Sequence, residues 1–290
     1  MQGTVDGFTY GLVTPVVAFA MACLGAALGL RCTTRSLRTE RSFKAGWLGL
    51  GATSIGSGIW TMHFVAMMGF TVEGAPIAYD KALTFASLAV AIVMVGIGIF
   101  IVGYRGATRM ALITGGTITG LGVASMHYLG MAGMQLRGQF TYDTVTVSLS
   151  VVIAVVAATA SLWAAVSVHG FAASLGASLV MGVAVSGMHY TGMAALDVHL
   201  HADAGSGAPA GETPATLIVP MLIGPACFLL LAGVVVMFDP LVVMGEPDRH
   251  DPRGGRGARD GARPRTTPVQ RQRATHGTPA RRDTRPPRHR

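Results

Sequence analysis

The chain has 290 residues, of which 51% are hydrophobic and 12% charged, and its formal net charge is +8. A soluble domain would carry about a quarter charged residues, so this composition excludes an ordinary soluble protein. The charge is unevenly placed, because residues 1–248 hold nine Lys and Arg against eleven Asp and Glu, whereas residues 249–290 hold thirteen Arg against three Asp. The basicity therefore belongs to a C-terminal tail and not to the apolar body.

Seven apolar runs follow one another along the chain, each long enough to cross a bilayer, for which about 20 residues are needed. They cover residues 9–30, 46–70, 82–103, 110–134, 145–168, 172–196 and 216–238. The first run differs from a cleavable signal peptide, because its basic residues begin after it, at Arg31. The sequence therefore predicts an all-α fold, a polytopic membrane bundle of about seven transmembrane helices in one domain over residues 9–240.

The connectors between the predicted helices indicate how the chain is oriented. The first and third connectors hold seven of the nine Lys and Arg of residues 1–248, and the second, fourth and sixth hold only Lys81 and Arg137. Basic connectors stay on the cytoplasmic side of a membrane. We therefore expect a multi-pass protein of the plasma membrane with its N-terminus outside and its C-terminus in the cytoplasm.

The predicted cytoplasmic tail, residues 249–290, has no aromatic residue and almost no large aliphatic one. Such a segment cannot bury a core and is predicted to be disordered. Because it lacks side chains that stack on bases, we expect no nucleic-acid partner. If the tail has a partner, anionic lipid headgroups fit its charge better, although a plain solvated tail fits the composition as well.

A Met-His-aromatic motif occurs three times within the apolar body. The copies are TMHFVAMMGF at 61–70, SMHYLGMAGM at 125–134 and SGMHYTGMAAL at 186–196. Their histidines, His63, His127 and His189, fall on the second, fourth and sixth predicted helices. Each lies about 17 residues from the cytoplasmic start of its helix, or about 25 Å at 1.5 Å per residue. The sequence thus predicts a threefold internal repeat of helix pairs, with the histidines at one depth near the outer surface.

A methionine follows each histidine by four residues, and residues four apart share one helix face. The predicted pairs are His63 with Met67, His127 with Met131, and His189 with Met193. Thioether and imidazole donors together suit copper, above all Cu(I). Zinc would more often include Cys or carboxylate ligands, and a haem with axial His or Met ligands is an alternative. The small residues around the motifs would let the helices approach closely, and both one shared ion and separate sites remain open.

Other members of the motif have simpler interpretations. The preceding Met62, Met126 and Met188 point about 100° away from the histidines around the helix, which makes them weaker ligand candidates. The aromatic residues that follow the histidines suit a belt at the membrane interface. A single methionine is usually core filler, and a single membrane histidine often forms a hydrogen bond between helices. The threefold repetition at one depth favours a metal or cofactor role.

The motif letters resemble those of the bacterial MHYT domain, an integral-membrane sensor module, over about residues 9–240. MHYT stands at 188–191, MHYL at 126–129 and MHFV at 62–65. The resemblance implies copper bound by His63, Met67, His127, Met131, His189 and Met193, and the sensing of a diatomic gas such as O2, CO or NO. Val65 and Leu129 replace the motif's threonine, so we do not expect that position to provide a ligand. No motif of the enzymatic output domains that many members carry occurs here, so we expect a non-enzymatic module that signals through a partner protein.

The principal alternative is a membrane protein that handles copper, by insertion, storage or transport, without signalling. It draws on the stretch DVHLH, in which Asp197, His199 and His201 could capture an ion outside the membrane. Exposed loop histidines are commonly just solvated. A redox enzyme is a third class, but the sequence names no general base or substrate pocket for it.

Overall fold

The computed structural model describes residues 5–6, 9–37, 39, 41–73, 75–168, 170–200 and 214–238. The predicted tail at 249–290 lies outside the described residues, as does His201. The described residues form seven long helices and three pairs of short strands, so the predicted all-α membrane bundle is confirmed. The helices are α1 Val13–Leu37, α2 Arg41–Met68, α3 Lys81–Arg105, α4 Arg109–Ala132, α5 Thr144–Ser167, α6 Phe171–Ala194 and α7 Pro214–Met237.

Five of the seven helices are long and apolar enough by themselves to cross a membrane, namely α1, α3, α5, α6 and α7. The other two, α2 and α4, are rich in Gly, Ser and Thr and each carries one motif histidine. Their polarity is compatible with a membrane, because most of α2 from residue 51 to residue 64 is buried by neighbouring helices and little of it faces lipid. The chain is thus a multi-pass membrane protein whose two most polar helices are shielded.

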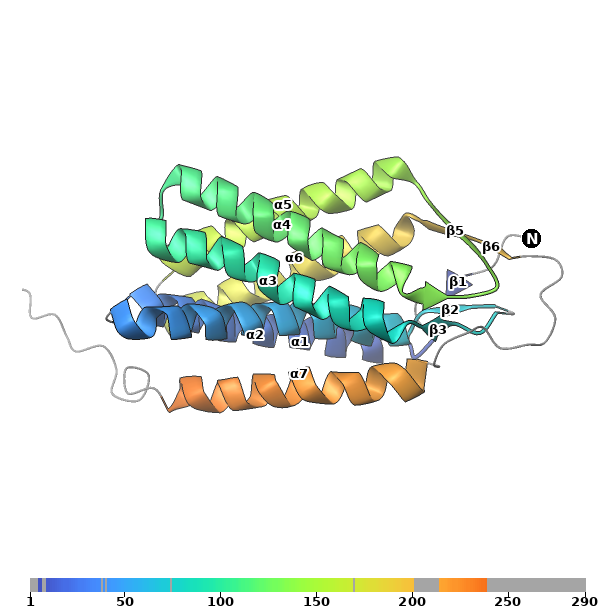
Figure 1. Ribbon diagram of the computed structural model, residues 1–290, viewed down its shortest axis with the longest axis horizontal. Helices are drawn as coiled ribbons and strands as arrows, with labels where there is room; N and C mark the ends of the chain where they lie inside the picture. Colours follow the sequence, from blue (N-terminus) through green and yellow to red (C-terminus); the bar gives the residue numbers. More distant parts are fainter. Residues whose placement is uncertain are drawn as a thin grey trace, which may run out of the picture. The chain divides into compact units, whose positions relative to one another are not determined.

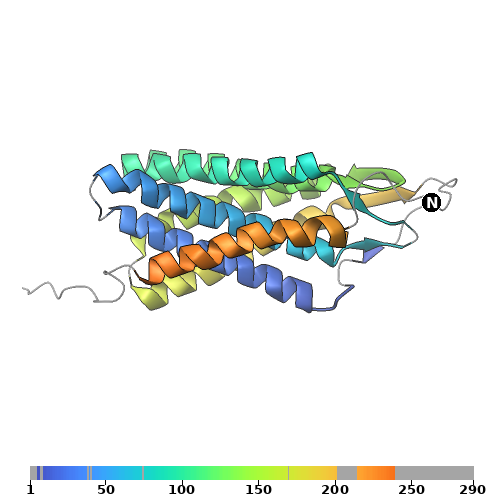
Figure 2. The ribbon, with the colours of Figure 1, turned by 60° about the horizontal axis from the view of Figure 1, so that its bottom comes forward.

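Six helices form a closed ring in chain order. Each of α1 to α5 packs against the next helix, and α6 packs back against α1, so the histidine-bearing α2, α4 and α6 alternate with α1, α3 and α5. The seventh helix lies outside this ring against α2 and α1, as Figures 1 and 2 show for the orange ribbon. The sequence did not reveal that α1, and not α7, stands beside α6.

Three short antiparallel strand pairs close the repeats at one end of the ring. They join β1 Val5–Asp6 to β2 Thr71–Val72, β3 Ala78–Tyr79 to β4 Met134–Gln135, and β5 Gly138–Tyr142 to β6 Leu196–Leu200. In each pair one strand precedes an odd-numbered helix and the other follows the next even-numbered helix. The predicted threefold repeat of helix pairs therefore takes the form strand–helix–helix–strand. We call this end of the bundle the strand end (right in Figure 1).

The opposite end of the ring, which we call the basic end, carries Arg31, Arg35, Lys44, Arg105 and Arg109. Two of the helices that start at the strand end, α3 and α5, are instead capped by acids. Asp80 accepts a hydrogen bond from the backbone N–H of Leu83 (2.8 Å), and Asp143 accepts one from that of Thr146 (2.8 Å). A side-chain oxygen at this position satisfies a backbone donor that the helix cannot.

Glycines permit the close helix crossings of the ring. A Cβ added at Gly25 of α1 would lie 2.7 Å from the Cα of Gly58 in α2, and one added at Gly56 of α2 would lie 2.8 Å from the Cα of Ile92 in α3. No real side chain fits at such distances, so these backbones touch only because glycine is present. Lipid tails are as apolar as the helix surfaces, so the hydrophobic effect does not drive membrane helices together. Close van der Waals contact of this kind holds them together instead.

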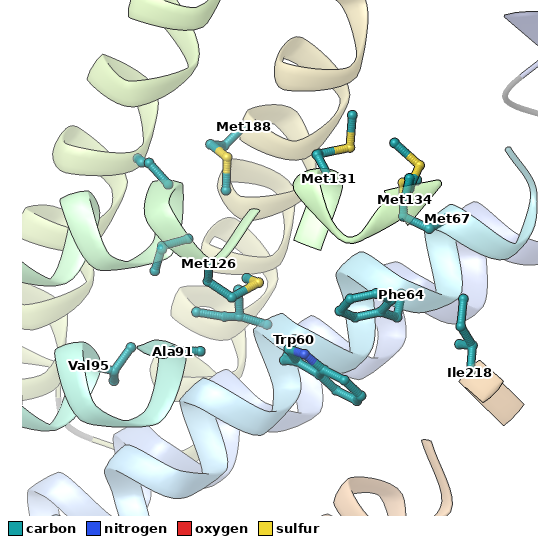
Figure 3. Close-up of a cluster of buried hydrophobic side chains, with 14 of the residues drawn as sticks. Trp60, Phe64, Met67, Ala91, Val95, Met126, Met131, Met134, Met188 and Ile218 are labelled. Atoms are coloured by element: carbon teal, nitrogen blue, oxygen red, sulfur yellow. The ribbon is translucent and has the colours of Figure 1, made fainter. Parts of the chain in front are cut away.

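The buried core reaches from the ring into the contact with α7. Trp60 and Phe64 of α2 are fully buried and belong to the same cluster as Ile218 of α7, toward which they project in Figure 3. Further along α7, Leu229 packs in a cluster with Leu28 of α1. Because Ile218 lies near the motif level and Leu28 is closer to the basic end, α7 runs from the strand end to the basic end.

Candidate metal centre

The three motif histidines lie at one level of the ring. Each is five residues before the last residue of its helix, Met68 for α2, Ala132 for α4 and Ala194 for α6. All three side chains are buried, with at most 1% of their surface exposed. The threefold packing of α2, α4 and α6 turns these equal positions toward one another, so the predicted common depth is found.

The imidazole Nδ1 atoms converge on one point. The Nδ1 atoms of His63 and His189 are 3.0 Å apart, those of His127 and His63 3.1 Å, and those of His189 and His127 3.4 Å. The three rings meet edge to face, with centroids 4.9–5.1 Å apart. Of the two arrangements that the sequence leaves open, the structure has the single shared cluster; whether it binds metal stays a prediction.

The triangle of nitrogens has the dimensions of a three-coordinate metal site. An atom at its centre lies about 1.8 Å from each Nδ1, and one displaced by about 1 Å along the axis reaches the 2.0–2.1 Å typical of a metal–imidazole bond such as Zn–N. No other group of three or more His, Cys, Asp or Glu side chains that could hold an ion is found among the described residues. The donor geometry therefore fits a metal ion.

Without a cation, this arrangement leaves nitrogen atoms poorly satisfied. The Nε2 atoms of His63 and His127 are buried and have no hydrogen-bond partner among the described residues. If Nε2 carries the proton, three Nδ1 lone pairs face one another; if Nδ1 carries it, Nε2 lone pairs are buried unpaired. A cation at the centre would satisfy the three Nδ1 lone pairs of the first case, and the Nε2–H groups of His63 and His127 would stay buried without a partner among the described residues.

Glycines position the far edges of two rings. A Cβ on Gly130 of α4 would lie 2.6 Å from Nε2 of His63, and a Cβ on Gly192 of α6 would overlap Nε2 of His127. Both glycines stand three residues after the histidine of their own motif, and Ala66 holds this position in the first motif. The sequence analysis missed these residues, although the repeated small residue three places after each histidine is a visible signal.

The aromatic residues of the motif pack on the histidines, and Phe64 lies inside the bundle and not in the predicted interfacial belt, whereas Tyr128 and Tyr190 stay partly exposed. Phe64 is fully buried, and its ring meets that of His63 at 4.7 Å between centroids. Tyr128 meets His127 at 4.9 Å, and its hydroxyl lies 2.6 Å from Oγ of Ser150 in α5. The prediction is wrong for Phe64 because position along a helix gives depth only, whereas the rotation of α2 turns this ring inward.

The methionines that follow the histidines lie one helical turn closer to the strand end. Met67 and Met131 are buried and Met193 is partly buried. In Figure 3, Met67 and Met131 lie together with Met134 of β4, which the sequence analysis did not consider; all three belong to one buried cluster. Their role as ligands stays a prediction. The preceding Met62, Met126 and Met188 are also buried, in apolar clusters that account for them as packing.

The other predicted ion-binding residues stand apart from the cluster. Asp197 and His199 are exposed on β6, where they pair with Thr141 and Gln139 of β5. A haem does not fit between the motif histidines, because their imidazoles touch one another and leave no room for a porphyrin. None of the seven helices contains Asp or Glu, so no carboxylate of a helix balances the charge of an ion at the centre.

Comparison with known proteins adds a family and several relatives. Residues 56–115, 120–178 and 182–241 each match the repeat described as "Bacterial signalling protein N terminal repeat", MHYT. The chain is 34% identical over 236 residues to the bifunctional diguanylate cyclase/cyclic di-GMP phosphodiesterase MucR of Pseudomonas aeruginosa, covering 80% of this chain and 34% of that protein. It is 32% identical over 200 residues to the signaling protein YkoW of Bacillus subtilis, covering 66% of this chain and 24% of that protein.

The chain therefore spans about a third or less of the length of these relatives. No solved structure matches it. Each matched repeat covers part of an even-numbered helix and the odd-numbered helix that follows it. The third repeat therefore joins α6, which belongs to the ring, to α7, which lies outside the ring against α2 and α1.

Proposed function

The chain belongs to the MHYT family of bacterial signalling repeats, and we propose that it is a membrane sensor module whose three-histidine cluster binds copper and presents it to a diatomic gas. The observation that supports this proposal best is the convergence of three buried Nδ1 atoms, from three different helices, within 3.0–3.4 Å of one another. Packing alone does not account for such a cluster, because burying three polar imidazoles side by side costs more than burying apolar side chains of the same size.

Electrostatics favours copper in its monovalent state over a divalent ion. Three neutral imidazoles leave the full charge of the ion uncompensated in a membrane interior. The cost of burying an ion rises with the square of its charge, so a site without carboxylates penalises Zn²⁺ about four times as much as Cu(I). The thioethers of Met67, Met131 and Met193, one turn toward the strand end, add soft donors of the kind that Cu(I) prefers.

When the three histidines are the only protein ligands, a tetrahedral ion keeps one position open, as in catalytic metal sites. In this protein that position is the place for a gas molecule. The name of MucR assigns cyclic di-GMP synthesis and breakdown to that longer protein, of which this chain matches only a part, and YkoW is named a signaling protein. We propose that the bundle is the input module in the same kind of signalling, that it performs no catalysis itself, and that a separate partner carries the output.

Metal analysis of the detergent-purified protein tests the copper assignment. We expect about one copper per chain, because the three histidines share one centre, and we expect the copper to be Cu(I) by its lack of an electron paramagnetic resonance signal. Stoichiometric zinc, or iron together with a haem absorption band, would reject copper. Retention of the ion through dialysis also argues against copper insertion or transport, because a cluster at most 1% exposed is suited to holding an ion and not to passing it on.

The sidedness of the bundle is a further part of the proposal. Arg31, Arg35, Lys44, Arg105 and Arg109 lie at the basic end, which the positive-inside rule assigns to the cytoplasm. We therefore expect a reporter fused after residue 239 to be active only if it works in the cytoplasm. A reporter inserted in the connector at 201–213 should report the outside. The opposite pattern would place the histidines near the cytoplasmic surface.

A further inference from the structure

An apolar cavity of about 50 Å³, measured as the space open to the centre of a water-sized sphere, lies inside the helix ring. All six ring helices contribute to its wall, and α7 does not. Alanines form much of the wall, above all on α5. Ala154, Ala157, Ala158 and Ala165 line it from α5, and Ala184 lines it from α6.

The cavity begins one helical turn from the histidine cluster, on its side toward the basic end. Ile59, Val123 and Val185 each stand four residues before a motif histidine, and all three line the cavity. Residues four apart on a helix share one face and differ by about 6 Å in height. The methionines Met67 and Met131 occupy the corresponding positions on the other side. The imidazoles therefore separate a layer of thioethers at the strand end from an open apolar space toward the basic end.

The wall of the cavity offers almost nothing to water. The hydroxyls of Thr33 and Ser161 already donate to backbone carbonyls of their own helices, those of Gly29 and Ala157 (2.8 and 2.7 Å). The remaining hydroxyl on the wall, that of Thr119, is buried without a partner among the described residues. A water molecule needs two to four polar partners, and a cavity needs only about 10–15 Å³ of such space to hold one. These three hydroxyls stand on three different helices, and every other lining side chain is apolar, so the space suits a small apolar molecule better than water.

We propose that this cavity is a dry chamber that binds a small apolar molecule, of the size of a diatomic gas, and supplies it to the side of the histidine cluster facing away from the methionines. The binding rests on the cavity alone, whereas the supply step rests on the proposed metal function. The chamber lies within a membrane, where apolar gases are more soluble than in water, so the gas reaches it from the lipid. The histidines are at most 1% exposed, and the nearest lining residues, Ile59, Val123 and Val185, stand one helical turn from them on the same faces, so the supply step requires the gas to pass this one layer of side chains.

Xenon tests the chamber without any metal. In the full-length protein, purified in detergent, we expect saturable xenon binding by ¹²⁹Xe NMR. Ala158→Leu places a larger side chain into the cavity from α5 and should abolish this binding. Ala160→Leu, the same change on an exposed position of the same helix, should leave it intact. Ala184→Leu fills the cavity from α6 and should repeat the loss, which guards against a folding defect of one variant. Xenon binding that is absent in the wild type, or unchanged in both filled variants, overturns the chamber.

A second measurement separates the chamber from its supply role. In protein loaded with Cu(I), Ala158→Leu should slow the association of CO severalfold without changing the copper content. Normal CO association in a variant that no longer binds xenon would reject supply through the chamber. If the protein binds no metal, the xenon result still stands, so the two proposals fail separately. A lipid acyl chain as the occupant, seen as a lipid that native mass spectrometry detects in the wild type but not in Ala158→Leu, would also overturn the gas chamber.

Discussion

His127→Ala is expected to remove nearly all bound copper from the protein, and not one third of it. The reason is that His63, His127 and His189 direct their Nδ1 atoms to one centre, so each substitution takes one of three ligands from the same ion. Loss of a partner that merely supports a metal ligand lowers affinity about 10–100-fold, and loss of a ligand itself should exceed that. Copper per chain by mass spectrometry, with competition against a Cu(I) chelator, measures the effect. His63→Ala and His189→Ala should match it.

Two methionine substitutions on α4 serve as controls. Met110→Leu changes an exposed side chain at the basic end of the helix and should leave copper binding unchanged. Met131→Leu removes the buried thioether but nearly keeps the volume, a swap that costs under about 1.5 kcal/mol in a core. A drop in copper affinity without a drop in stability would identify Met131 as a ligand, and normal affinity would make it packing. Copper retained in a folded variant that lacks all three histidines would end the assignment.

Gly192→Ala should weaken copper binding although residue 192 has no side chain that could coordinate the ion. A Cβ at this position overlaps Nε2 of His127 and lies 2.9 Å from its Cδ2, so the imidazole has to move away from α6. Its Nδ1 then leaves the triangle. We expect affinity for Cu(I) to fall about 10–100-fold, the usual effect of disturbing the support of a metal ligand. Chelator competition and thermal unfolding, measured on the same samples, separate a loss of affinity from a loss of folding.

Gly187→Ala provides the matched control on the same helix. A Cβ at Gly187 meets no atom within 4 Å, and the residue is exposed. This substitution should keep copper affinity and raise stability slightly, because alanine in a helix is favoured over glycine by about 0.5–1 kcal/mol. Equal affinities of the two variants would show that the imidazole edge is not held by Gly192. The first motif has Ala66 at the same position, where it packs with Ala18 and Ala22 of α1, so the three junctions are not equivalent.

The sequence predicts most of this fold and the location of its site, for identifiable reasons. Hydropathy locates the helices, and the spacing of 64 and 62 residues between His63, His127 and His189 places them at one depth. The sequence cannot predict which helices are neighbours, because α1 and α7 are both apolar and either could stand beside α6. It also cannot give the rotation of a helix that is buried on most sides. Phe64, one residue after His63, was therefore assigned to the interface, whereas it packs between Trp60 and Tyr79.

The strands and the glycines were missed for a different reason. A strand pair of two residues, such as β1 with β2, is too short to produce an alternating pattern. The functional weight of Gly130 and Gly192 depends on an imidazole that arrives from another helix. Both features are properties of the assembled repeat and not of any one segment.

Because α7 lies outside the ring, it changes the end of the bundle at which the chain leaves the helices. Six helices complete the ring and its cluster of histidines, but an even number of crossings returns the chain to the face from which it started, where β6 pairs with β5. The seventh crossing adds nothing to the ring wall and carries the chain to the opposite face. It does so while Ile218 packs in one cluster with Phe64, the residue beside His63. α7 thus packs at its start against the level of the histidine motifs and ends at the basic end, on the face opposite the strand pairs.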